Sequence, residues 1–134
     1  MRESVAMRQG SPVLARIVGH ATHSQEPAWF TTAPVHAIRK LLARIGWTIG
    51  STDLFEINEA FAVVAMAAAR DLEIPDEKLN IHGGACALGH PIGATGARIV
   101  VTLLHALQRT RSRRGIAALC IGGGEATAIA IERG

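Results

Sequence analysis

Apolar side chains repeat with helical spacing in the segment that follows Pro34. Pro34 suits the first turn of a helix, and Gly46 can adopt the left-handed conformation that ends one. The spacing therefore predicts a helix over 34–45 with one buried face. Its apolar stripe is Val35, Ile38, Leu41, Leu42 and Ile45.

Two further segments have helical patterns of different kinds. Residues 58–72 are apolar on almost all sides, which predicts a helix, with Asn58 as its N-cap, that lies between layers or at a subunit interface. Residues 95–110 have one apolar stripe and are followed by arginines that complement the negative end of a helix.

Four short apolar runs predict strands, at 13–18, 54–57, 116–121 and 127–131. The last two are joined by Gly122, Gly123 and Gly124, a connection short enough for a hairpin. Residues 20–27 and the glycine-rich segment 82–94 are expected to be loops. Alternating strands and helices predict an α/β fold whose sheet is mostly parallel, with one antiparallel strand from the hairpin.

Composition limits the classes of protein that this chain can be. With 134 residues, 49% of them apolar and 19% charged, it is expected to form one globular domain. The net charge is only +3, and 4% aromatic residues with no Tyr argue against nucleic-acid binding. We expect a cytoplasmic protein without a membrane span or a signal peptide. Its two cysteines, Cys86 and Cys120, are expected to be free thiols.

Three candidate functional residues lie at the ends of predicted strands or in the long loop. They are Asn58, His90 and Cys120, and glycine amides follow Cys120. A neutral imidazole can take a proton from a thiol, a thiolate can take one from the carbon next to a thioester, and glycine amides can bind an oxyanion. Thioester chemistry would use all three functions.

Each of these residues also has an ordinary structural explanation. A single loop histidine is more often a surface residue, and a cysteine at a strand end is often buried and inert. His82, Cys86 and His90 recur every four residues as metal ligands on a helix would, but the intervening glycines prevent a helix, so we expect no metal. The glycine-rich segments also lack the Lys of a phosphate-binding loop and the full dinucleotide fingerprint.

The combination of three segments resembles the C-terminal half of thiolases. These segments are NEAF at 58–61, GGACALGHPIGATGAR at 83–98 and CIGGG at 120–124. The resemblance covers the chain from about residue 13, so we expect a thiolase C-terminal domain over 13–134 after a flexible lead-in at 1–12. It implies a thiolase-like half-fold: a mixed, mostly parallel five-stranded sheet with helices on both faces and a C-terminal antiparallel hairpin.

The resemblance implies acyltransferase chemistry of fatty-acid metabolism, in which two acyl-CoA molecules give a 3-ketoacyl-CoA and CoA, or the reverse. His90 matches the histidine that activates the nucleophilic cysteine, and Cys120 matches the cysteine that moves the α-proton. Asn58 matches the asparagine that holds a water of one oxyanion hole, and the amide of Gly122 matches a donor of the other. Coenzyme A thioesters would be substrates, with no permanently bound cofactor.

Neither cysteine stands in the setting of the family's acylated cysteine, which belongs to the N-terminal half. We therefore expect the isolated chain to be inactive without a thiolase N-terminal half. Because the helix predicted over 58–72 is apolar on almost all sides, we also expect self-association or a tight partner. The alternative is a non-catalytic, thiolase-like interaction module or pseudoenzyme subunit, because fold and function separate readily.

Overall fold

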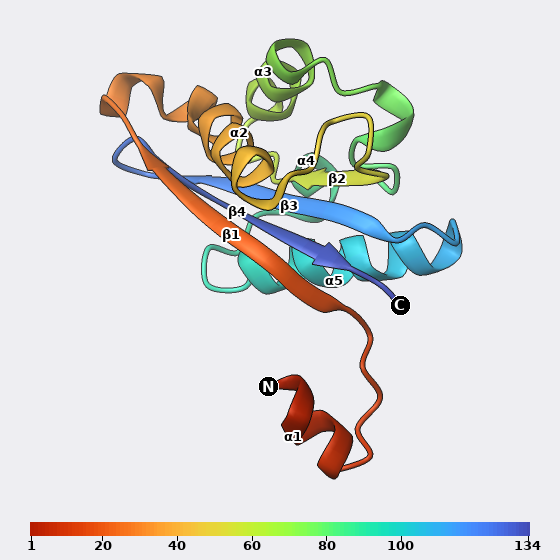
Figure 1. Ribbon diagram of the computed structural model, residues 1–134. Coiled ribbons are helices and arrows are strands. Elements are labelled where there is room, and N and C mark those ends of the chain that lie inside the picture. The colour runs from red at the N-terminus through yellow and green to blue at the C-terminus, as the bar shows by residue number, and fades with distance from the viewer.

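The computed structural model describes residues 1–134 and shows one four-stranded sheet with helices on both faces (Figure 1). The strands are β1 (Arg16–Ser24), β2 (Leu54–Ile57), β3 (Arg114–Ile121) and β4 (Glu125–Glu132). The α-helices are α1 (Glu3–Arg8), α2 (Ala33–Ile45), α3 (Ala62–Leu72), α4 (Ala85–Leu88) and α5 (Thr95–Arg109). Two 3-10 helices are η1 (Pro27–Thr32) and η2 (Asp76–Lys78).

The strand order is β1-β4-β3-β2, which corrects two details of the expected sheet. There are four strands rather than five. Only β2 and β3 pair in parallel, whereas β4 is antiparallel to both β3 and β1, so the sheet is mixed but not mostly parallel. The cause is the position of β4: the terminal hairpin places it between β3 and β1, where it forms two antiparallel pairings. The α/β class and the antiparallel C-terminal hairpin are confirmed.

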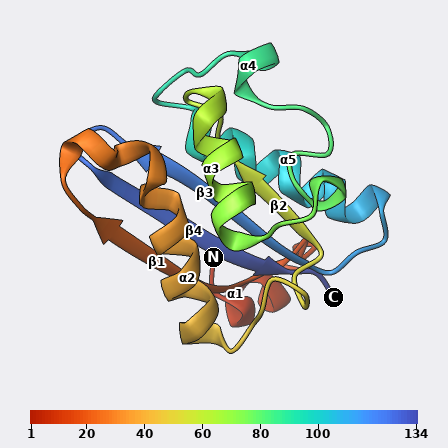
Figure 2. The ribbon, with the colours of Figure 1, turned by 90° about the horizontal axis from the view of Figure 1, so that it is seen from above.

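Two apolar cores lie on opposite faces of the sheet. Helices α2 and α3 cover one face and bury Ile38, Leu41 and Val64 against strand residues such as Phe55 and Ile116. Helix α5 covers the other face, where a smaller core surrounds it (Figures 1 and 2). The members of this smaller core are Leu54, Ile99, Leu103, Ala106, Leu107, Ala117 and Ile131. Alternate residues of β3 point to opposite faces, as a pleated strand requires.

Strand β1 is longer than its sequence pattern predicts and begins later. The pattern ends the strand before Gly19 and makes 20–27 a loop, but β1 continues to Ser24 beside β4. A shift in register between Ile17 and Gly19 lets the strand continue past the glycine. A Cβ at Gly19 would lie 2.7 Å from a methyl carbon of Ile45, so the glycine also lets α2 pack closely on β1.

The first residues form a short helix, α1, joined to β1 by an extended segment. In Figure 1 this helix lies apart from α2 and α3, on the side of the sheet that α5 occupies. Of its residues only Ala6 is buried. None of the helices is both long and apolar enough to cross a membrane.

Candidate functional site

The carboxyl end of β2 positions the first candidate side chain. Asn58 directly follows this strand, and its backbone N–H donates to the carbonyl oxygen of Ala118 in β3 at 2.9 Å. Its side chain is fully buried. The prediction that Asn58 caps the next helix is wrong, because α3 begins at Ala62 and Phe61 occupies the N-cap. The Asn58 amide is instead bound by side chains that come from the later loop and helix.

Arg98, in the first turn of α5, binds two buried side chains, those of Glu56 and Asn58. Its Nη1 donates to Oε1 of Glu56 at 2.8 Å, and its Nη2 donates to Oδ1 of Asn58 at 3.0 Å. The Glu56 side chain is 3% exposed and that of Arg98 is 21% exposed. A carboxylate buried to this extent needs a charged, hydrogen-bonded partner, and the planar guanidinium group of Arg98 is that partner.

Burial dominates the electrostatics of Glu56. Removal from water raises the pKa of its carboxyl group to about 7, and this effect outweighs the charge and hydrogen bond of Arg98, which lower the pKa. The group therefore titrates in the neutral range although it lies within an apolar strand.

His90 lies in the exposed loop before α5 and is held from both sides of its ring. Its Nε2 is 3.5 Å from Nδ2 of Asn58, and its Nδ1 is 2.6 Å from Oγ1 of Thr95. The Thr95 hydroxyl is also 3.0 Å from the carbonyl oxygen of Pro91, and Thr95 is fully buried. A buried threonine and a buried asparagine thus orient an imidazole that solvent can reach.

The loop before His90 is attached to the end of β2 through Glu59. Its carboxylate accepts hydrogen bonds from the backbone N–H of Cys86 at 3.0 Å and from Nδ2 of Asn80 at 3.2 Å. Burial by itself would raise the pKa of Glu59, but these hydrogen bonds outweigh it, so the pKa is lowered. A Cβ at Gly84 would lie 2.5 Å from the Glu59 carboxyl carbon, so a glycine permits this close approach.

Cys120 and Gly122 lie at the end of β3, beside the strand that Asn58 follows. Cys120 is buried in the core under α2 and α3, and burial raises the pKa of its thiol. It makes no hydrogen bond to Asn58 or His90. Gly122 is exposed, at the start of the hairpin turn. The structure therefore brings Asn58 and His90 into direct contact and leaves Cys120 and Gly122 on the neighbouring strand end.

Three polar residues of this site were missed from the sequence: Glu56, Thr95 and Arg98. A signal existed for Glu56, because a carboxylate within the apolar run LFEI needs a buried partner. The sequence does not show that this partner is Arg98, 42 positions later.

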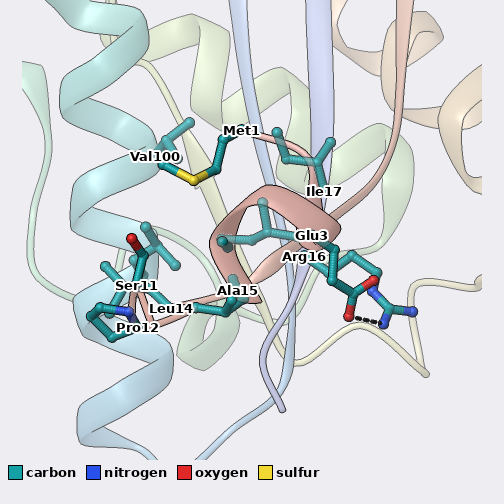
Figure 3. A pocket seen from close by; sticks show the side chains of 13 residues that line it. Met1, Glu3, Ser11, Pro12, Leu14, Ala15, Arg16, Ile17 and Val100 are labelled. Carbon is teal, nitrogen blue, oxygen red and sulfur yellow. Dashed lines mark hydrogen bonds and ion pairs between the residues drawn. The ribbon is translucent and has the colours of Figure 1, made fainter. Parts of the chain in front are cut away.

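Other features of the surface do not involve these residues. A cavity of about 500 Å³ lies between the N-terminal segment and α5, with Met1, Leu14, Ile17 and Val100 among its mostly apolar lining (Figure 3). No site residue lines it. No group of three or more His, Cys, Asp or Glu residues is arranged to hold a metal ion.

Comparison with known proteins finds similar chains. The family model described as "Thiolase, C-terminal domain" matches residues 11–133. The cytosolic acetyl-CoA acetyltransferase of Mus musculus is 50% identical over 134 residues, which are 100% of this chain and 34% of that protein. An acetyl-CoA acetyltransferase of Shinella zoogloeoides is 50% identical over 98% of this chain and 34% of its own length.

Solved structures give the same result. The Bacillus anthracis acetyl-CoA acetyltransferase has a TM-score of 0.96 and 45% identity over 99% of this chain and 34% of its own. Human mitochondrial 3-ketoacyl-CoA thiolase has a TM-score of 0.95 and 38% identity over 98% of this chain and 33% of its own. The chain thus spans about a third of the length of these relatives. It belongs to the thiolase family, as a thiolase C-terminal domain.

Proposed function

We propose that this chain supplies the C-terminal part of a thiolase active site that converts an acyl-CoA and acetyl-CoA to a 3-ketoacyl-CoA and CoA, or catalyses the reverse thiolysis. The observation that carries the proposal is the contact between the Asn58 amide and the exposed His90 imidazole, within segments that match the family. Its substrates are coenzyme A thioesters, as the names of the relatives indicate for those proteins. No permanently bound cofactor is part of the proposal.

His90 has the role of a base that takes the proton of a nucleophilic thiol. An imidazole can do this when one ring nitrogen is unprotonated and reaches solvent or substrate. The Asn58 amide, which binds the Nε2 side of the ring, would hold a water that donates a hydrogen bond to the developing thioester oxyanion. The Gly122 amide, exposed at the turn after β3, would donate to a second oxyanion.

Cys120 has the role of moving the α-proton. In condensation its thiolate would take a proton from the carbon next to the thioester, and in thiolysis its thiol would return one. The raised pKa of the buried thiol keeps it protonated at neutral pH in this chain, which suits the second direction.

The cysteine that carries the acyl group would come from another segment. Neither Cys86 nor Cys120 makes a hydrogen bond to His90, so no thiol of this chain is in a position to be activated by it. We therefore propose that a thiolase N-terminal half completes the site, in the cytoplasm. Without that half, we expect the chain to be inactive.

The sharpest test is a chimera of the Shinella zoogloeoides enzyme whose matching C-terminal third is replaced by this chain. We expect the chimera to cleave acetoacetyl-CoA with CoA, and we expect His90→Ala to abolish this activity. His20→Ala, which alters an exposed histidine of β1, serves as the matched control and leaves the rate unchanged. A folded chimera with no thiolysis would contradict the proposed function.

A second candidate function is a non-catalytic interaction module, and one surface favours it. Phe61, Val63 and Met66 are 59%, 51% and 66% exposed at the start of α3 and on its outer side. A group of exposed apolar residues is typical of a surface that binds another protein. A folded chimera that retains normal assembly without thiolysis would favour this function over catalysis.

A further inference from the structure

Arg98 determines how the Asn58 side-chain amide is oriented. A guanidinium group has only donors, so the Asn58 atom that faces Nη2 of Arg98 at 3.0 Å must be its oxygen. The amide nitrogen then points toward His90, with Nδ2 3.5 Å from Nε2 of the ring. The ion pair with Glu56 holds Arg98 in place, since both oxygen acceptors bind the same guanidinium.

The orientation of Asn58 decides which nitrogen of His90 carries the proton in the neutral ring. An amide nitrogen can only donate, so Nε2 of His90 must accept and is unprotonated. The proton is then on Nδ1, which donates to Oγ1 of Thr95 at 2.6 Å. The Thr95 hydroxyl in turn donates to the carbonyl oxygen of Pro91 at 3.0 Å, an atom that can only accept.

The direction of this chain is set at its Arg98 end, through Asn58 to Nε2 of His90. The Thr95 hydroxyl can then accept from Nδ1 and donate to the Pro91 carbonyl, which also accepts the backbone N–H groups of Ala94 and Thr95. Asn58 is fully buried, so a protonated Nε2 of His90 would leave the Asn58 amide nitrogen unpaired away from water at a cost of about 1–3 kcal/mol. The opposite tautomer of His90 would place its Nε2 proton against the amide protons of Asn58. The network therefore selects one tautomer.

We propose that Arg98 and Thr95 are positioning residues that fix the Nδ1–H tautomer of His90 and leave Nε2 as the nitrogen that accepts a proton. The tautomer follows from the hydrogen-bond network alone. Its importance for catalysis rests on the proposed thiolase function.

Nitrogen-15 NMR of the full chain with labelled histidine tests the tautomer without an activity assay. At a pH where the ring is neutral, we expect the His90 signals of the wild type to show a protonated Nδ1 and an unprotonated Nε2. The variant His90→Gln identifies these signals by their disappearance. A wild-type ring with its proton mainly on Nε2, or divided evenly between the nitrogens, would overturn the proposal.

Thr95→Val and Thr95→Ser form a matched pair, because valine keeps the shape of the buried side chain and serine keeps its hydroxyl. We expect Thr95→Val to shift the His90 signals toward a mixture of tautomers and Thr95→Ser to retain the wild-type pattern. An unchanged pattern in Thr95→Val overturns the proposal for Thr95.

The chimera described above connects the tautomer to activity. There, Thr95→Val is expected to lower kcat about tenfold with little change in KM, and Thr95→Ser is expected to restore most of the rate. Thr95→Val with normal activity but a mixed tautomer would overturn the catalytic part of the proposal. If the wild-type chimera lacks thiolysis while the NMR pattern is as expected, the proposed function fails and the tautomer assignment stands.

Discussion

Nη1 of Arg98, in the first turn of α5, lies 2.8 Å from Oε1 of Glu56 in the middle of β2. This ion pair joins a helix on one face of the sheet to a buried strand residue. It is the structural centre of the candidate site because the second nitrogen of the same guanidinium orients Asn58.

Removing Arg98 should destabilise the fold strongly. Arg98→Met leaves the Glu56 carboxylate buried without a partner, and breaking a buried pair from one side costs about 3–5 kcal/mol. We expect this loss in the free energy of unfolding measured with urea at a pH of about 8, where Glu56 is charged. The control is Glu3→Gln, which removes an ion pair with Arg16; the Arg16 and Glu3 side chains are 69% and 64% exposed. Losing this exposed pair should lower the free energy of unfolding by at most about 1 kcal/mol. Equal effects of the two variants would contradict a special role for the buried pair.

Stability should depend on pH through Glu56. Because burial raises the pKa of its carboxyl group from 4.5 to about 7, the folded protein binds this proton more tightly than the unfolded chain. The resulting stabilisation is fully present below the unfolded pKa and is lost as the pH rises through about 7. Urea midpoints between about pH 5 and about pH 8 should therefore decline in the wild type and decline less in Glu56→Gln. Identical slopes for the two proteins would show that Glu56 titrates normally.

The hairpin turn after β3 should not tolerate a side chain at Gly124. A Cβ there would collide with the carbonyl oxygen of Gln25, and the φ of +86° is strained for other residues. We expect Gly124→Ala to lower the free energy of unfolding by at least about 1–3 kcal/mol. The matched control is Gly122→Ala, because the space around its Cβ position is open. Thermal unfolding of the two variants measures the difference. A stable Gly124→Ala variant would mean that the turn can move away from Gln25.

The two thiols should differ in reactivity. Desolvation raises the pKa of both thiols, with a further contribution from Glu59 for Cys86, so exposure makes the difference: Cys86 is exposed and Cys120 is buried. A thiol reagent at neutral pH should modify Cys86 quickly in the native chain, and both cysteines quickly in denaturant. Cys86→Ser should remove the fast reaction and Cys120→Ser should leave it. Fast modification of Cys120 would show that the end of β3 opens readily.

The apolar surface at α3 should support association. We expect the chain to sediment as a dimer or larger species, because Phe61, Val63 and Met66 are exposed together. Met66→Lys should weaken this association, whereas Met7→Lys, at an exposed methionine of α1, should not. A wild-type chain that is monomeric at every concentration would contradict the expectation.

The amino-acid sequence by itself determined most of the local structure. The helix predicted over 34–45 is α2 (Ala33–Ile45), and the helix predicted from Thr95 is α5. These elements follow from apolar spacing and from Pro34 and Gly46, which act over a few neighbouring residues. Three short motifs, at 58–61, 83–98 and 120–124, carried the resemblance to thiolases, which the comparisons confirm.

Only the tertiary structure decided how the strands pair and how the site is connected. The sequence could not show that β1 extends past Gly19 along β4, because the strand that pairs with it, β4 (Glu125–Glu132), lies at the far end of the chain. It also made Asn58 the cap of the next helix, which is wrong, since the partners that bind its side chain, His90 and Arg98, follow 32 and 40 positions later. The physical reason is that a buried polar group takes its role from whichever partner the fold brings into hydrogen-bond distance, and chain spacing alone does not specify that partner.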